Sequence, residues 1–131
     1  MARCEICGKE GYRHHIIFKS QGGFEFSLNY KYLCLEHHSG RLSPHKNNKI
    51  DISYKLELQE KLKDILQDDY YSKEKIRELL DLNNNTLKKL ISNLKLYKEG
   101  YKNQDIIFKL MGNKIYNEYM LEDFYDMLSN F

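Results

Sequence analysis

Two short pairs of soft metal-ligand residues constrain the fold of this chain more than any other feature. Cys4 and Cys7 are spaced by two residues, and so are Cys34 and His37. Two such pairs can place four donors around one tetrahedral zinc ion, which is a far more specific signal than a single pair. The three cysteines cannot all form disulfides, and Cys4-x-x-Cys7 alone could also be a redox motif or be incidental, with Cys34 a small buried side chain. We expect a zinc site formed by Cys4, Cys7, Cys34 and His37.

The charge of the chain is unevenly distributed along its 131 residues. Residues 1–50 carry eight basic and four acidic side chains, and residues 84–114 carry seven basic and two acidic side chains. The other two segments, 51–83 and 115–131, are net acidic. Two basic blocks suit a chain that touches nucleic acid at two places, and they equally suit two solvated faces. The length fits one domain, or a small metal-held unit followed by a helical one.

The sequence has neither a membrane-spanning segment nor a secretory signal by the usual criteria. Its apolar runs are only a few residues long, and its first residues lack the apolar stretch of a signal peptide. We therefore expect a cytoplasmic protein that does not enter a membrane.

The secondary structure is expected to change character near residue 50. The first part is rich in Cys, His and Gly, and it is too small to bury a sufficient core without a metal. From Asp51, a candidate helix cap, apolar residues recur at helical spacing. The expected elements are a strand over 13–18, a returning strand over 24–28 or 32–35, a helical turn over 35–40, helices over 51–67, 73–80, 85–97 and 103–111, and an amphipathic segment over 116–128.

Histidines stand beside the proposed zinc ligands. His14 and His15 are adjacent on the first expected strand, and His38 follows His37 directly. Neighbouring side chains of a strand point to opposite faces, so one histidine could face a metal while the other faces a substrate. The simpler interpretation is that His14 or His15 is a core residue or supports a ligand.

These motifs together resemble the HNH endonuclease signature. The resemblance rests on Cys4-Glu5-Ile6-Cys7, on the run from His14-His15 to Gly22-Gly23, on Asn29 to Leu33, and on Cys34-Leu35-Glu36-His37-His38. More narrowly, the chain is similar to small HNH-type proteins carried by phages of Gram-positive bacteria, which would place it in the host cytoplasm. The resemblance implies an α+β protein with a zinc-held ββα-metal module over residues 1–50 and a helical region over 51–131.

The resemblance also implies roles for individual residues. His15 matches the general base, and Asn29 matches the residue that orients it. His14 and His38 match ligands of a catalytic divalent cation, Mg²⁺ or Mn²⁺. His45 is a candidate third ligand, with a solvated loop histidine as the alternative. Separately from the resemblance, four basic side chains are candidate phosphate contacts, although each is ordinarily solvated: Arg13, Lys19, Arg41 and Lys46.

Residues 72–97 are similar to a helix-turn-helix. The segment has a capped first helix, a leucine pair, a short turn, and a second helix that opens with polar residues. An ordinary helical hairpin would give the same pattern. In the helix-turn-helix interpretation, the residues that would contact DNA are Asn84, Asn85, Thr86, Lys88 and Lys89.

These observations suggest three possible functions, which they support to different degrees. The leading hypothesis is a metal-dependent endonuclease that cleaves or nicks double-stranded DNA. The alternative is a non-catalytic zinc protein that binds DNA or a protein, for which the acidic tail residues Glu118, Glu122, Asp123 and Asp126 would suit a basic partner. A thioredoxin-like redox protein is the weakest hypothesis, since the βαβ context is missing and the histidines stay unexplained.

Overall fold

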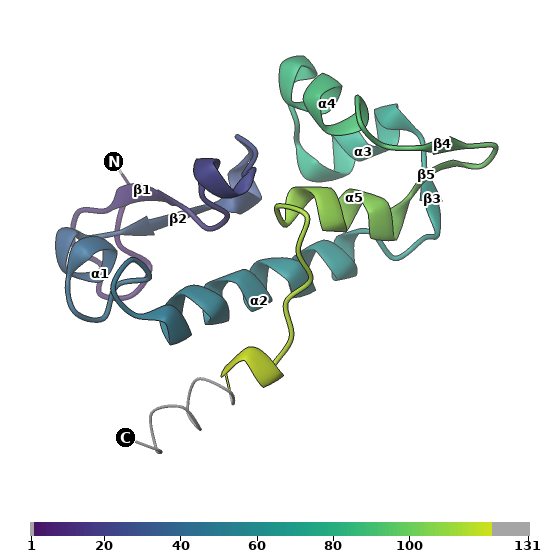
Figure 1. Cartoon of the computed structure of the whole chain (residues 1–131). Helices are drawn as coiled ribbons and strands as arrows, with labels where there is room; N and C mark the ends of the chain where they lie inside the picture. The colour runs from purple at the N-terminus through teal and green to yellow at the C-terminus, as the bar shows by residue number, and fades with distance from the viewer. Residues whose placement is uncertain (1, 122–131) are drawn as a thin grey trace. The chain divides into compact units, whose positions relative to one another are not determined.

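The computed structural model describes residues 2–121 and shows a mixed α+β chain (Figure 1). Two compact units are present. The first unit comprises, within the described part, residues 2–16, 30–57 and 116–121, and the second unit comprises 17–29 and 58–115. The expected boundary near residue 50 therefore falls inside one helix, α2 (Asn48–Ile65). No helix among the described residues is both long and apolar enough to span a membrane.

The first unit is built on a two-stranded antiparallel sheet. Strand β1 (Tyr12–His15) pairs with β2 (Tyr30–Leu33), with His15 opposite Tyr30. The first strand is shorter than the expected 13–18, because the chain turns into a 3-10 helix at Lys19–Gln21 that ends at Gly22 with a positive φ of 87°. Of the two expected return strands, the later one overlaps β2.

Two helices complete the first unit. Helix α1 (Leu35–Ser39) follows β2 directly, which confirms the expected helical turn, and it packs on both strands. Asp51 does not cap α2: the helix begins at Asn48, and the side chain of Asn47 accepts the Ile50 N–H at 3.2 Å. A small buried apolar cluster of this unit consists of Cys4, Leu33 and Cys34 with Tyr54 packed against it, and Ile16 and Ile52 are also buried in this unit.

The second unit combines helices with a three-stranded sheet. After β3 (Tyr70–Tyr71) come α3 (Lys73–Leu80) and α4 (Asn84–Ile91), then β4 (Leu96–Tyr97), β5 (Gly100–Lys102) and α5 (Asn103–Leu110). The sheet is antiparallel with the order β3-β5-β4. Its buried residues include Leu58, Leu62 and Leu66 and inward residues of the three short helices, namely Ile76, Leu80, Leu87, Leu90, Ile106 and Leu110.

Sequence signals located most helix starts of this unit but missed its sheet. Ser72 caps α3 as expected, accepting the Lys75 N–H at 3.2 Å. The predicted helix over 85–97 is too long, because α4 ends at Ile91 and residues 96–102 form a β-hairpin. The predicted segment over 116–128 lies largely outside the described residues, together with Glu122, Asp123 and Asp126.

Candidate metal centres

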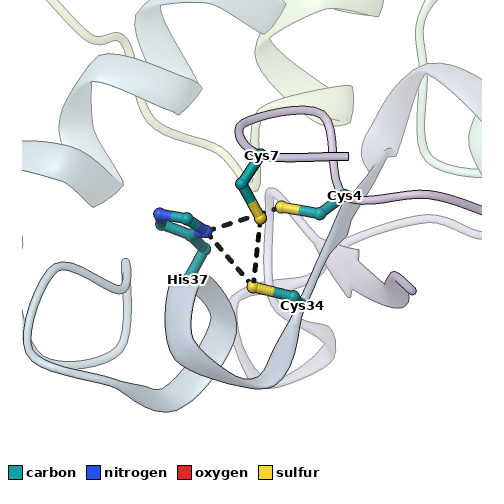
Figure 2. A group of neighbouring side chains, drawn as sticks. All are labelled: Cys4, Cys7, Cys34 and His37. Atoms are coloured by element: carbon teal, nitrogen blue, oxygen red, sulfur yellow. Dashed lines mark hydrogen bonds between the residues drawn. The ribbon is translucent and has the colours of Figure 1, made fainter. Parts of the chain in front are cut away.

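Four ligand side chains converge in the first unit (Figure 2). Cys4 and Cys7 come from a tight loop, which the Cys4 N–H closes on the Lys9 carbonyl at 2.7 Å. Cys34 is the residue directly before α1, and His37 lies one turn further along that helix. A C-x-x-C loop facing the start of a helix thus brings the two sequence pairs together.

The spacing of these donor atoms matches the size of a zinc site. A tetrahedral ion with Zn–S bonds near 2.3 Å and Zn–N bonds near 2.0–2.1 Å places two sulfurs about 3.8 Å apart, and sulfur and nitrogen about 3.6 Å apart. The Cys7 and Cys34 Sγ atoms are 3.7 Å apart, and His37 Nδ1 lies 3.6 Å from Cys4 Sγ and 3.2 Å from Cys34 Sγ. This Cys₃His cluster could therefore hold a metal ion such as zinc.

The electrostatics of the cluster favour the thiolate form of two of its three cysteines, Cys4 and Cys34. Burial opposes ionisation of the Cys4 thiol, but backbone N–H groups of Cys34, Cys7 and Ile6 outweigh that effect and lower its pKa to about 6. The His37 N–H is the main cause of the lowered pKa of Cys34. Zinc binds the thiolate and not the thiol, so this local environment prepares Cys4 and Cys34 for a cation. At Cys7 the Lys9 N–H lowers the pKa, but desolvation and the neighbouring Cys34 and Cys4 together outweigh it, so the pKa of Cys7 is raised instead.

A second cluster consists of three histidines. His14 is buried on β1, His38 is half-buried on α1, and His45 is exposed in the loop before α2. Their ring centroids are 4.8–5.2 Å apart, and the Nε2 atoms of His38 and His45 are separated by 3.2 Å. Two nitrogens that share an ion at 2.0–2.1 Å lie about 2.9 Å apart at 90° and about 3.3 Å apart at the tetrahedral angle.

Two of the three histidines, His14 and His38, also favour the protonation state that a metal requires. Burial, reinforced by His45 and His38, lowers the pKa of His14 to about 3. Burial likewise lowers the pKa of His38, with a contribution from His45. Neutral imidazole is the form that coordinates a cation, so the donor set fits a divalent ion.

His15 is the next residue after His14 on β1 and is half-buried. Its ring meets the ring of its cross-strand partner Tyr30 edge to face, with centroids 5.3 Å apart. The guanidinium of Arg13 lies 4.1 Å from the centre of the same tyrosine ring. Sequence reasoning missed Tyr30, and the register of β1 on β2 is what brings it beside His15.

Asn29 has a different set of partners from the one that its expected role suggests. Its side chain is completely buried. Its Oδ1 accepts the Ile17 N–H at 2.8 Å, and its Nδ2 donates to the carbonyls of Ile17 and Phe24 at 3.1 and 3.0 Å. Asn29 thus holds the backbone of the segment that follows β1, and these contacts do not include His15.

The candidate phosphate contacts of the first fifty residues differ in their surroundings. Arg13 is exposed, and its Nη2 lies 3.5 Å from the Tyr32 hydroxyl in addition to its contact with Tyr30. Lys19 forms an ion pair with Glu25 at 3.3 Å. Arg41 and Lys46 are exposed in the loop between α1 and α2.

The five candidate DNA contacts of the helical region do not all face outward. Asn84, Asn85, Lys88 and Lys89 are exposed on α4. Thr86 is buried, and its hydroxyl donates to the Glu25 carbonyl at 3.2 Å. Thr86 consequently belongs to the packed side of α4, and we withdraw it as a DNA contact.

A buried ion pair on α2, within the first unit, was also not anticipated. The side chain of Lys55 is almost completely buried, and its Nζ donates to Asp51 Oδ2 at 2.6 Å. The i, i+4 spacing of these two residues was the only available signal, and it is common on solvated helices too. Burial of both groups depends on packing that the spacing does not report.

Comparisons with protein-family models, with curated proteins and with solved structures gave no match for this chain.

Proposed function

We propose that this chain is a metal-dependent DNA endonuclease of the HNH type. The single observation that carries the proposal is the convergence of His14, His38 and His45 into a cluster sized for one cation, with His15 next to His14 on the same strand. The separate Cys₃His cluster would hold structural zinc. A zinc-held frame with a second, all-histidine donor set is more than a purely structural site requires.

The proposed chemistry assigns one task to each group. His15, as a neutral imidazole, takes the proton from the water whose oxygen attacks phosphorus. The new P–O bond forms as the bond to the leaving sugar oxygen breaks, and that oxygen takes up a proton from solvent. A divalent cation held by His14, His38 and His45 would supply positive charge to stabilise the transition state and the leaving oxygen. Because imidazole donors suit transition-metal ions and Mg²⁺ prefers oxygen ligands, the three histidines favour a transition-metal ion over Mg²⁺.

Tyr30 and Asn29 support this assignment indirectly. The edge-to-face contact with Tyr30 limits the orientations of the His15 ring. The hydrogen bonds of Asn29 fix the backbone at Ile17, two residues beyond His15. In this proposal Asn29 positions the base through the backbone instead of through a direct contact.

Replacement of His15 tests the proposal. We expect His15→Ala to reduce nicking or cleavage of a supercoiled plasmid in Mg²⁺ or Mn²⁺ by about 10²-fold or more, because a general base contributes about 10²–10⁴ to the rate. His15→Phe is the matched control, since it keeps a ring against Tyr30 and removes the base. Both variants should retain circular dichroism and zinc content, and added imidazole should restore part of the activity of His15→Ala.

The alternative function is a non-catalytic zinc module that binds DNA or a protein, and the Cys₃His cluster by itself would be sufficient for it. Metal analysis separates the two. The endonuclease predicts two cations per chain, one of which is lost in His38→Ala with zinc retained. Equal plasmid cleavage by wild type and His15→Ala would show that the catalytic assignment is wrong.

A further inference from the structure

The second unit exposes a basic surface formed by α4 and the β4–β5 hairpin, hereafter the α4–hairpin surface. Residues 84–102 contain five lysines and one acidic residue, Glu99. Lys88, Lys89, Lys95 and Lys98 are all exposed. Within residues 2–121, none of these four lysines has an acidic partner within ion-pair distance. No acidic side chain among residues 2–121 therefore neutralises these four lysines.

Helix α4 separates an inner apolar side from an outer polar side. Leu87 and Leu90 are buried, whereas Asn85, Lys88 and Lys89 point outward. Lysine ammonium groups pair with phosphates, and an asparagine amide can bond the edge of adenine. A helix with its side chains is about 10–12 Å wide, which matches the major groove of about 12 Å.

A cleft between α3 and α4 adds a place for a phosphate. It has a volume of about 340 Å³, and its lining includes Lys73, Arg77 and Lys88 with one acid, Glu74. Arg77 Nη1 donates to Asn84 Oδ1 at 3.5 Å, which holds the guanidinium at the first residue of α4. Three cations beside a helix N-terminus form a favourable environment for an anion.

The hairpin is close enough to α4 to act on the same ligand. Helix α4 ends at Ile91 and β4 begins at Leu96. The five Cα–Cα steps between these residues, each about 3.8 Å, span at most about 19 Å. This distance is shorter than one turn of duplex DNA, which is about 34 Å long, so one duplex can contact both elements. Lys95 leads into the hairpin and Lys98 lies in its loop, which projects from the unit (Figure 1).

The aromatic residues of the hairpin do not suit a single strand. Binding of single strands uses exposed rings on which bases stack. Tyr97 is half-buried, its ring meets Tyr70 edge to face at 5.7 Å, and the Lys95 ammonium lies 4.7 Å from its centre. The sequence of α4 contains no aromatic residue. The surface thus offers charge and a fixed helix, which are features suited to a duplex.

We propose that the α4–hairpin surface binds double-stranded DNA, with α4 in the major groove and Lys95 and Lys98 on the phosphate backbone beside it. The α3–α4 cleft takes a phosphate through Lys73 and Arg77. The choice of DNA as the ligand rests on the proposed endonuclease function, but the binding surface shares no residue with the histidine cluster.

Binding of the full chain to a random-sequence 30-bp duplex tests this inference, with fluorescence anisotropy measured between 50 and 200 mM salt. Two double variants each remove two of the proposed phosphate contacts. One is Lys88→Gln/Lys89→Gln on α4, and the other is Lys95→Gln/Lys98→Gln at the hairpin. Lys61→Gln/Lys63→Gln on α2 is the matched control, since it removes the same charge from exposed residues of the same unit. All three proteins should keep the circular dichroism of the wild type.

We expect each test variant to bind about tenfold or more weakly and to lower the slope of log K against log salt by about 1.8, since each lost phosphate contact removes about 0.9. The control should stay within about twofold of wild type. Test variants that bind like the control overturn the inference, and so does a preference for single-stranded DNA or duplex RNA over duplex DNA.

These experiments test the DNA-binding surface and the endonuclease proposal independently of each other. His15→Ala should bind the duplex like wild type without cleaving it. If no protein cleaves DNA and the lysine-dependent duplex binding persists, then the endonuclease proposal is wrong and the interface stands. If plasmid cleavage depends on His15 but binding ignores the four lysines, the interface is wrong and the endonuclease stands.

Discussion

At the residue scale, adjacent histidines serve different purposes. His37 joins the three cysteines, whereas His38 joins His14 and His45. Consecutive residues of a helix point about 100° apart, so two neighbours on α1 can supply two separate clusters. Successive side chains of a strand point to opposite faces, so His14 and His15 on β1 also point in different directions. These two short elements therefore contribute histidines to two candidate metal clusters and carry the candidate base.

Asn29 gives a prediction at this scale. Asn29→Ala removes three hydrogen bonds and leaves the buried N–H and C=O of Ile17 and the Phe24 carbonyl without that partner. Each buried group left unsatisfied costs about 1–3 kcal/mol, so we expect the free energy of unfolding to fall by about 3 kcal/mol or more in urea denaturation.

Asn85→Ala is the matched control, because Asn85 is an exposed asparagine of the same unit. The control should change the free energy of unfolding by less than about 0.5 kcal/mol. A loss below about 1 kcal/mol in Asn29→Ala would show that water replaces the amide and that Asn29 does not hold this segment.

At the element scale, one glycine permits the sheet of the second unit. Gly100 begins β5 with a φ of 127°, and a Cβ at this position would lie 2.7 Å from the Tyr71 carbonyl oxygen on β3. Strand β5 can approach β3 this closely only without a side chain. The central strand of the sheet, and with it the hairpin, depends on that approach.

Gly100→Ala should therefore destabilise the chain strongly. Gly8→Ala is the control for backbone strain alone, since Gly8 also has a positive φ, 79°, but nothing lies within 4 Å of its added Cβ. We expect Gly100→Ala to lose at least about 2 kcal/mol more than Gly8→Ala in urea denaturation. Equal losses in the two variants would mean that the sheet adjusts to the methyl group.

At the scale of the whole molecule, the two units are stabilised by different means. The first unit has a small apolar cluster around Cys4, Leu33 and Cys34, together with two clusters that could hold metal ions. The second unit buries aliphatic side chains from α3, α4 and α5, and its described residues contain no such cluster. A small unit with little apolar core depends on a metal for its stability.

Removal of metal should consequently act on one unit. After treatment with 1,10-phenanthroline, we expect backbone amides of residues 2–16 and 30–57 to lose protection from hydrogen exchange, while those of 66–110 keep it. Protection should return when zinc is added. An equal loss in both units would contradict this prediction, and so would no loss in either.

Short-range features of this protein could be predicted from its sequence. The spacing of Cys4, Cys7, Cys34 and His37 indicated the Cys₃His cluster, and Ser72 marked the start of α3. These signals are visible because ligand spacing and helix caps act over a few residues.

Contacts between residues that are distant in the sequence could not be predicted in this way, because they depend on long-range packing and strand pairing. The register of β1 on β2 places Tyr30 against His15, packing turns Thr86 inward and engages Asn29 with Ile17 and Phe24, and β5 pairs with the distant β3. Strands of two or three residues have too few positions for a periodic signal, so local propensity favoured extending α4 into them. The hairpin exists because long-range pairing and a close backbone approach at Gly100 outweigh that propensity.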